Sequence, residues 1–364
     1  MISGSLPTIR CGVGYYTHKL LQELPSDMNL EVMSTKGIKE DLGKATYTVP
    51  DWKIGSLPAM IRNIKASNAQ IIHIQYPAVG YRRNLGINLL PYALRLLKPR
   101  TKILVSLHEY HESRLLGRWR DFITVWPAHQ IIVSNQLDCQ SLGRLERKTT
   151  VIPIGDNFDK AQEDPAVYGQ LLVKHKLDAS RPVLMFFGFA EPNKRVEVLL
   201  DALIEPGLEN YQALLLTSLD KDDAYQQMLM ARVKELNFAE KRVAVAGFLP
   251  DNEVSAVLQE GKYFVLPQQQ PLSPKSSTAI TAVINGLILI SAGSSNPQET
   301  FPFENGKNCL LISPMDSAHL AKAIVMIDKD SNAQANLKTG ALELAGYFSW
   351  PAIVNKHLEV YEKL

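Results

Sequence analysis

Hydroxyl side chains and free backbone amides are predicted to gather in one segment of this 364-residue sequence. Residues 265–290 read VLPQQQPLSPKSSTAITAVINGLILI, an apolar run followed by a Pro- and Ser-rich loop, a helical stretch and a second apolar run. Ser276, Ser277 and Thr278 open the predicted helix, and a helix start leaves backbone N–H groups without intrahelical partners. Such termini favour anions, phosphate above all. The segment therefore predicts a phosphate site, with Lys275 as an adjacent cation.

A second group of candidate residues lies near the start of the chain, in SGSLPTIRCGVGYYTHKLLQEL. Gly12 and Gly14 precede a helical pattern whose apolar side includes Tyr16 and Leu20. Glycines ahead of a helix let the backbone approach a ligand closely. The G-x-G spacing is equally typical of a bare structural turn, so the motif alone leaves both interpretations open.

Histidines occur within or just after two predicted strands. His108 follows the run KILVSL, which places it at the edge of a sheet, and Glu109, His111 and Glu112 come next. The spacing of these groups matches no common zinc pattern. We therefore expect His111 and Glu112 to pack in the loop or to face an acceptor. His73 lies inside a strand, where a hydrogen-bonded core residue is the usual outcome.

The elements that would position these residues are short apolar strands separated by helix-length segments. Such strands of ~5 residues are typical of parallel sheets covered on both faces. Ligands of these folds bind at the carboxyl ends of the strands. We predict strands at residues 70–75, 102–107, 130–133, 150–152, 183–187, 213–217, 243–246, 263–266 and 287–290.

Length and charge limit the class of protein further. A chain of 364 residues suggests two domains of roughly 150 residues each, and the charged segment 156–181 predicts the boundary between them. With 39 basic and 37 acidic residues the net charge is only +2, which argues against a nucleic-acid protein. A local basic or membrane-facing patch is one interpretation, and a solvated face is the other, for Tyr15, Tyr16, His18, Lys19, Arg114, Arg118 and Arg120.

Cysteine usage and apolar runs suggest where the protein works. Three cysteines far apart, without a C-x-x-C pattern, indicate a reducing compartment without structural disulfides or zinc. We see neither a signal-peptide pattern nor an apolar run near the ~18 residues of a membrane span. The expected location is the cytoplasm, with contact to the inner face of the membrane left open.

The order of these motifs resembles that of the GT-B glycosyltransferases of family 4, from SGSLPTIRCGVG to the C-terminal FSWPAIVNKHLEVYEKL. The resemblance implies an α/β protein of two doubly wound, Rossmann-like domains facing a cleft. Residues 1–160 would bind the acceptor and residues 161–345 the nucleotide-sugar donor. Residues 346–364 would form an amphipathic helix that returns to the first domain.

The same resemblance assigns roles to individual residues. Gly12 and Gly14 fall on a Gly-rich loop beneath the donor sugar and acceptor, and His108 on a histidine that approaches the acceptor or the transferred sugar. Lys194, in the unit VLMFFGFAEPNKRVEVLLDAL, falls on a lysine that contacts the donor diphosphate. Phe248 and Leu249 occupy a turn that packs on the nucleobase through its backbone. Without the resemblance, Lys194 would be an ordinary solvated lysine at a helix start.

The sequence departs from the family at three positions. Relatives carry two glutamates separated by seven residues where this chain has Ser273 and Thr281. Thr281 can accept a hydrogen bond from a ribose hydroxyl but carries no charge, and a lost charge-assisted pair costs about 1.5–3 kcal/mol. Phe189 replaces an arginine that many relatives carry, and Lys275 or Arg195 could supply its charge. We therefore expect either weaker nucleotide binding than in relatives or another residue that supplies the lost contact.

The resemblance implies a retaining glycosyltransferase that uses a nucleotide-diphosphate sugar, with UDP-glucose as the default, and a glycan or lipid-linked acceptor. No cofactor and no metal are expected. The D-x-D letters at 220–222 and 328–330 lie beside predicted helix ends, where Asp is common as a cap. Two alternatives remain: a sugar-nucleotide-binding pseudoenzyme, suggested by Ser273 and Thr281, and a GT-B sugar-nucleotide epimerase.

Overall fold

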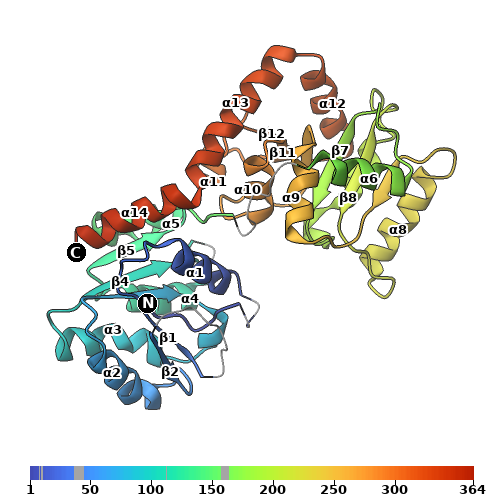
Figure 1. Ribbon diagram of the computed structural model, residues 1–364. Coiled ribbons are helices and arrows are strands. Elements are labelled where there is room, and N and C mark those ends of the chain that lie inside the picture. The colour runs from blue at the N-terminus through green and yellow to red at the C-terminus, as the bar shows by residue number, and fades with distance from the viewer. Residues whose placement is uncertain (8, 10, 37–44, 112, 157–163) are drawn as a thin grey trace. The chain divides into compact units, whose positions relative to one another are not determined.

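The computed structural model describes every residue except 8, 10, 37–44, 112 and 157–163 (Figure 1). The chain divides into two compact units. Unit 1 comprises residues 1–157 together with 350–364, and unit 2 comprises residues 158–349. Each unit is a parallel sheet between helices, which confirms the predicted α/β class of two Rossmann-like domains. The C-terminal helix belongs to unit 1, as the resemblance implied.

Unit 1 is built on parallel strands that Ile2 connects into one sheet. Ile2 forms parallel bridges to Met33 of the first strand and to Ile74 of the third. The pairing order is β1-β2 in one part and β3-β4-β5-β6 in the other. The strands are β1 (Glu31–Thr35), β2 (Ala45–Val49), β3 (Ile71–Tyr76), β4 (Lys102–Leu107), β5 (Gln130–Val133) and β6 (Thr149–Val151). The α-helices are α1 (Gly12–Glu23), α2 (Leu57–Ala66), α3 (Gly86–Leu97), α4 (Leu115–Val125), α5 (Gln136–Ser141) and α14 (Trp350–Glu362).

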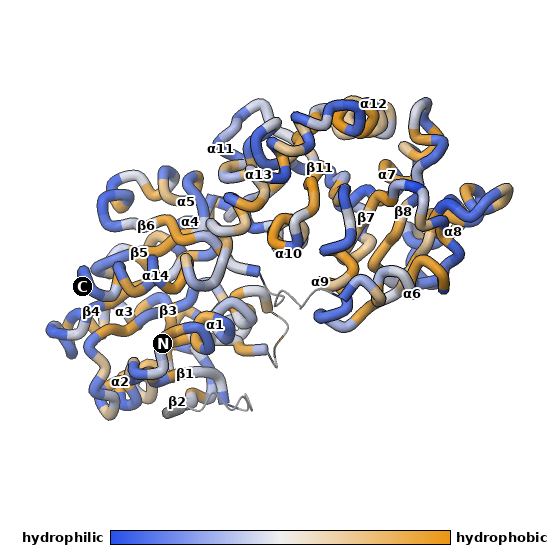
Figure 2. The backbone as a smooth tube through the Cα atoms, turned by 45° about the horizontal axis from the view of Figure 1, so that its top comes forward, coloured by the Kyte–Doolittle hydropathy of each residue, from blue (hydrophilic) through white to orange (hydrophobic). Residues whose placement is uncertain are grey.

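Both faces of this sheet are buried, which explains its apolar strands. In β4, Ile103 and Val105 join the core beneath α2, α3 and α4, whereas Leu104 joins the core beneath α1 and α14. Successive side chains of a strand point to opposite faces. A strand covered on both sides therefore has no polar alternation, and Figure 2 shows the resulting hydrophobic strands. No helix among the described residues is long and apolar enough to cross a membrane.

Unit 2 contains a six-stranded parallel sheet in the order β12-β11-β10-β7-β8-β9. Its strands are β7 (Val183–Phe187), β8 (Gln212–Leu216), β9 (Val243–Val245), β10 (Tyr263–Leu266), β11 (Ile288–Ala292) and β12 (Leu310–Ile312). Its α-helices are α6 (Pro165–His175), α7 (Val196–Ala202), α8 (Ala224–Leu236), α9 (Asp251–Gln259), α10 (Ser277–Ile284), α11 (Pro297–Thr300), α12 (Ser317–Asp328) and α13 (Ser331–Phe348). Four predicted strands agree residue for residue: 102–107, 130–133, 183–187 and 263–266.

A buried polar seam joins α14 to the rest of unit 1. The Tyr16 hydroxyl lies 2.8 Å from Nε2 of His357, and the Tyr361 hydroxyl lies 2.9 Å from Nδ1 of His73. His73 and His357 are both buried. Burial lowers the pKa of His357 to about 3 and that of His73 well below its usual range. Both imidazoles are therefore neutral in the folded protein.

Acidification is expected to destabilise unit 1 through His357. Its pKa is about 3 in the folded chain, against an ordinary value of 6.5, so the unfolded chain binds more protons between these limits. The stability contributed by the neutral ring is fully present above the ordinary pKa. It falls by about 1.4 kcal/mol per pH unit as the pH drops toward 3. Urea unfolding at neutral and mildly acidic pH, followed by tryptophan fluorescence, measures this slope, because all four tryptophans lie in unit 1.

A His357→Gln variant is expected to lose part of that pH dependence, since glutamine does not titrate. The matched control is His319→Gln, because His319 is exposed on α12 of unit 2 and bonds Asp316 there. An equal slope in wild type and His357→Gln would contradict this assignment.

Candidate functional site

Unit 2 places its candidate ligand site where the chain reverses direction across the sheet. From β7 the chain runs outward to β8 and β9, and it then returns to the other side of β7 as β10. In open parallel sheets, ligands bind at such a switch point, beyond the carboxyl ends of the strands. The segments that follow β7 and β10 therefore form the candidate site.

These segments lie close together, and a hydrogen bond joins two of them. Gly188, directly after β7, has a φ of +124°, and a Cβ added there would lie 3.4 Å from Oγ1 of Thr278 at the start of α10. The loop after β10 donates from the Gln269 amide to the Asn193 carbonyl at 2.9 Å. Asn193 belongs to a short 3-10 helix, η4 (Pro192–Lys194). Lys194 therefore sits on a segment bonded to the loop that leads into α10.

α10 begins at the Ser- and Thr-rich segment that its sequence predicted. Ser276 is the N-cap, and its side chain accepts from the Ala279 amide. Its own backbone amide donates to the Ser273 carbonyl at 3.0 Å. In the part of the chain that the structure describes, the backbone amides of Ser277 and Thr278 donate to no partner. These two groups can donate to a phosphate.

Lys194 adds a cation that nothing described in the structure neutralises directly. Its ammonium makes no hydrogen bond or ion pair with any described residue. Burial lowers the pKa of Lys194, and the charge of Glu191 opposes that shift only in part. A partly desolvated cation that no direct ion pair neutralises gains from an incoming anion. Arg195 cannot serve instead, because it donates to the Met315 carbonyl at 2.9 Å and lies 3.7 Å from Glu197.

The loop residues before α10 have structural contacts of their own. Ser273 is half-buried, and its hydroxyl accepts from the Lys275 amide at 3.2 Å. Ser273 therefore shapes the turn into α10. Lys275 is half-buried beside it. Neither position carries a carboxylate that could bind a sugar hydroxyl.

Thr281 does not fit the predicted ribose contact. It is 0% exposed, and its hydroxyl donates to the Ser277 carbonyl, one turn earlier, at 2.9 Å. A threonine inside a helix commonly bonds back in this way. The side chain lies on the core side of α10, so we withdraw it from the predicted ligand contacts.

An exposed aromatic pair flanks the same sheet edge. Phe189 follows β7 and Phe248 follows β9, and their ring centroids lie 5.8 Å apart in an edge-to-face arrangement. Both rings are exposed, whereas Leu249 is half-buried. Phe189, at the position where many relatives carry an arginine, thus contributes an apolar surface. Aromatic faces of this kind can stack on a planar base.

The two D-x-D sequences are engaged in local structure. Asp220 accepts from the Asp222 amide at 2.9 Å. Asp328 accepts from the Lys262 ammonium and the Tyr263 hydroxyl, and Asp330 caps α13. The described residues contain no group of three acidic, His or Cys side chains that could hold a metal ion.

In unit 1, Gly12 and Gly14 lie in the first turn of α1 rather than in a loop ahead of it. A Cβ on Gly14 would lie 3.2 Å from the carbonyl carbon of Ser5, so this glycine allows α1 to pack against the backbone. Gly12 is exposed, and a Cβ there would meet open space. The structural interpretation of G-x-G therefore applies to Gly14, and only Gly12 is placed to face a ligand.

His108 stands at the carboxyl end of β4, as predicted. Its backbone amide donates to the Tyr76 carbonyl at 2.8 Å, and its ring packs edge-on against Tyr16. Nε2 lies 2.8 Å from Oε1 of Gln75. An amide oxygen only accepts, so Nε2 carries the proton and Nδ1 is the acceptor of this tautomer.

Gln75 connects His108 to the buried seam beneath α14. Its amide nitrogen lies 3.2 Å from Nε2 of His73, which is itself 2.8 Å from the Ser106 hydroxyl. Gln75 is fully buried. Its amide is therefore held in one orientation, and His73 is the hydrogen-bonded core residue that its position in a strand predicted.

The loop beyond His108 is fixed by a carboxylate that the sequence did not single out. Asp138, fully buried on α5, accepts from the backbone amides of Tyr110 and His111 at 3.2 and 2.7 Å. His111 is exposed, and its ring lies 3.1 Å from the Ser141 hydroxyl at the end of α5. Glu112 lies outside the described residues. Beside His108 is a hollow of about 10 Å³, enough for about one water molecule.

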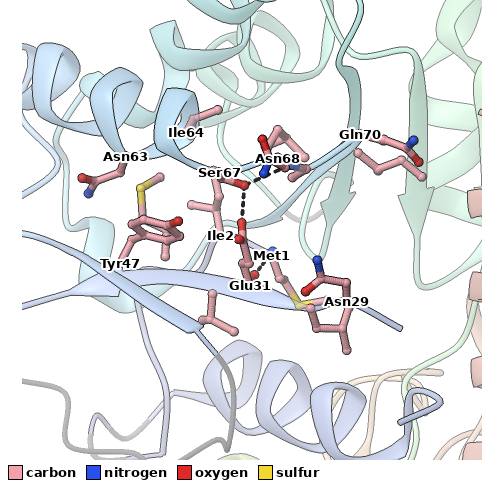
Figure 3. A pocket seen from close by; sticks show the side chains of 16 residues that line it. Met1, Ile2, Asn29, Glu31, Tyr47, Asn63, Ile64, Ser67, Asn68 and Gln70 are labelled. Carbon is pink, nitrogen blue, oxygen red and sulfur yellow. Dashed lines mark hydrogen bonds between the residues drawn. The ribbon is translucent and has the colours of Figure 1, made fainter. Parts of the chain in front are cut away.

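A larger pocket of about 340 Å³ lies elsewhere in unit 1 (Figure 3). The residues that line it lie at the amino ends of β1 and β3 and include Met1 and Ile2. The Met1 amino group donates to the Glu31 carbonyl at 2.6 Å, and the Ser67 hydroxyl donates to the Glu31 carboxylate. None of the predicted site residues lines this pocket, which opens at the edge of the sheet opposite to His108.

Known proteins share this architecture. Sucrose-phosphate synthase from Thermosynechococcus elongatus aligns with a TM-score of 0.68 at 21% identity, over 97% of this chain and 93% of that chain. Anabaena HepE in complex with UDP aligns with a TM-score of 0.73 at 17% identity, over 96% of both chains. A glycosyltransferase from Rickettsia africae aligns with a TM-score of 0.74 at 15% identity, over 100% of this chain and 97% of that chain. A sequence search of curated proteins finds no match.

The protein therefore has the GT-B fold of glycosyltransferases. Residues 181–330, which lie within unit 2, match the family model described as glycosyl transferases group 1. The matched segment contains the switch point, Lys194 and the start of α10.

Proposed function

We propose that this protein is a glycosyltransferase that moves a sugar from a nucleotide-diphosphate donor to a hydroxyl of a glycan or lipid-linked acceptor. The observation that carries this proposal is the pair of unpartnered amides, Ser277 and Thr278, on the loop bonded to the Lys194 segment within the group 1 domain. UDP-glucose is the first donor to test. Support comes from Anabaena HepE, whose structures are described as complexes with UDP and with UDP-glucose.

In the proposed reaction, the bond between the sugar C1 and the diphosphate oxygen breaks, and the electron pair leaves with the diphosphate. The acceptor oxygen attacks C1 on the same face, which retains the anomeric configuration, and its proton passes to a diphosphate oxygen. Lys194 and the two α10 amides stabilise the charge that grows on the leaving group. Such interactions are stronger in the transition state than in the ground state. Within unit 1, His108 would position the sugar or the acceptor through Nδ1.

The direct test combines calorimetry with UDP and UDP-glucose and a transfer assay with a panel of nucleotide sugars. The proposal requires both nucleotide binding and release of UDP coupled to sugar transfer. Binding of UDP without turnover of any donor would instead favour a pseudoenzyme, for which the lack of carboxylates at Ser273 and Thr281 is the supporting observation.

An epimerase remains the other alternative, because a putative UDP-N-acetylglucosamine 2-epimerase from Listeria monocytogenes aligns with a TM-score of 0.64 at 11% identity. Incubation of donor sugars without an acceptor separates the two reactions. A new epimer in the nuclear magnetic resonance spectrum would identify an epimerase, whereas a transferase leaves the sugar configuration unchanged.

Chelation is expected to leave the activity intact. The proposed leaving-group stabilisation uses a lysine and backbone amides, so it needs no Mg²⁺ bridge between protein and diphosphate. Turnover in excess EDTA should equal turnover in added Mg²⁺ or Mn²⁺ within about twofold. A loss of activity in EDTA that is restored by metal would overturn the metal-independent mechanism while leaving the transferase assignment open.

A further inference from the structure

The α3 and α4 helices of unit 1 present apolar side chains to solvent. On α4, Leu115, Leu116 and Trp119 are 78%, 86% and 67% exposed, and Ile123 and Trp126 continue the same stripe. Their spacing keeps all five on one side of the helix. Large apolar side chains gathered on one exposed face mark an interaction surface, whereas scattered ones need no explanation.

The neighbouring helix extends this stripe. The exposed apolar residues of α3 and its N-cap also recur at helical spacing: Leu85, Leu89, Tyr92, Leu96 and Leu97. The opposite sides of α3 and α4 bury Leu90, Leu94 and Val125 in one core under the sheet, and the two helices contact each other. Because the two helices contact each other, we call their outward sides together the α3–α4 face.

Charge is strongly segregated around this face. Residues 82–126 contain nine Lys or Arg and only three Asp or Glu, although the whole chain has 39 and 37. One of the three acids, Asp121, is 1% exposed and bonded to Ser113. Arg82, Arg83 and Arg114 are exposed. The rest of the chain is consequently net acidic, and these exposed arginines lie at the N-terminal ends of α3 and α4.

We propose that the α3–α4 face docks on the surface of an anionic lipid bilayer. Leucine and tryptophan side chains enter the interfacial region of a bilayer, and arginines on the flanks bind lipid phosphates. Each basic residue near an anionic leaflet strengthens the attachment. A protein partner would match the leucines and tryptophans but would not require a rim of one sign, so the charge favours the membrane.

The place of this face in the chain connects it with the candidate site. Only residues 109–114 separate His108 from α4. A membrane bound to α4 would therefore hold the His108 loop near the lipid surface. Under the proposed function, this favours a lipid-linked acceptor over a soluble glycan. The docking itself does not depend on that function.

The test is co-sedimentation of the full chain with vesicles of phosphatidylcholine alone or of phosphatidylcholine mixed with phosphatidylglycerol. Wild type is expected to bind the anionic vesicles with a blue shift of tryptophan fluorescence. A Leu116→Ser/Trp119→Ser variant should bind at least about tenfold more weakly, and Arg83→Glu/Arg114→Glu should lose the preference for anionic lipid. Phe238→Ser, at a 93% exposed position in unit 2, is the matched control and should bind as wild type.

Calorimetry with UDP separates this proposal from the proposed function, because the surface variants should bind UDP as wild type does. Wild type that sediments with neither vesicle, or equally with both, would overturn the proposal. So would a concentration-dependent dimer in analytical ultracentrifugation that Leu116→Ser/Trp119→Ser abolishes, because the face would then belong to a second copy of the chain.

Discussion

Replacing Lys194 with alanine is expected to lower kcat by about 10²–10³-fold, the usual effect of removing one group that stabilises developing negative charge. The lysine is half-buried, and its ammonium bonds no described residue, so its charge is available to a ligand. Most of the loss should fall on kcat rather than on the affinity for UDP-glucose, because the diphosphate carries more negative charge as it leaves. Steady-state kinetics with saturating donor and acceptor measure the effect.

The stability of the same variant gives an independent prediction. A desolvated cation without a partner costs free energy in the ligand-free protein, so Lys194→Ala should unfold at the same temperature as wild type or slightly above it. Lys322→Ala, which removes an exposed lysine from α12, is the matched control for a change of one charge. Unchanged kcat in Lys194→Ala, or a loss that merely follows a fall in melting temperature, would remove the assigned role.

Lys194→Arg tests whether charge alone is sufficient. Guanidinium keeps the positive charge but replaces a compact ammonium with a wider planar group. We expect partial recovery relative to alanine, because η4 is bonded through Asn193 to the Gln269 loop and cannot shift freely.

The sheets could be predicted because burial on both faces leaves a continuous apolar run with no competing signal. Strands β1, β2 and β12 were not predicted, although the edge strands β6 and β9 were. ATYTV in β2 alternates polar and apolar residues, and LLI in β12 is only three residues long. The start of α10 was also readable, because Ser276 has the chemistry of an N-cap and acts as one.

Thr281 shows where a family position misleads. Its alignment with a glutamate suggested a ligand contact, yet its place four residues after Ser277 lets the hydroxyl bond the helix backbone. Tyr16 was grouped with a basic patch, but it is buried beneath α14, and Lys19 pairs with Glu23 at 3.1 Å. Of the arginines in that group, Arg114 is exposed beside the α3–α4 face, whereas Arg118 and Arg120 are half-buried.

Gln75 was detectable in part. A glutamine inside the apolar run QIIHIQ must find hydrogen-bond partners when buried, and alternation puts it on the same face as His73. Ser106 on the neighbouring strand bonds His73, and the register of β3 and β4 places it opposite Gln75. His73 also contacts Tyr361, which lies on α14, 288 residues further along the chain than His73. No local pattern reveals that distant contact.

The second large effect on activity is expected at His108 and at Gln75, which bonds its ring. His108→Ala should lower kcat/KM by about 10²-fold, the scale of a lost positioning contact at a reacting group. Gln75→Leu removes the acceptor of the Nε2 proton, so the ring can adopt the other tautomer, and a loss of about tenfold is expected. Transfer kinetics and thermal unfolding of each variant separate loss of activity from loss of fold.

The double variant decides whether Gln75 acts through His108. If it does, Gln75→Leu should have no further effect in the His108→Ala background, because the group that it positions is already gone. Additive losses would show that Gln75 supports the fold of unit 1 rather than the orientation of His108. A Gln75→Glu variant adds a second readout, since a carboxylate beside the ring favours its protonated form. Nδ1 must be unprotonated to accept a hydrogen bond. The acid limb of the pH–rate profile should therefore move to higher pH in Gln75→Glu. An acid limb at the same pH as in wild type would contradict the role of Nδ1 as an acceptor.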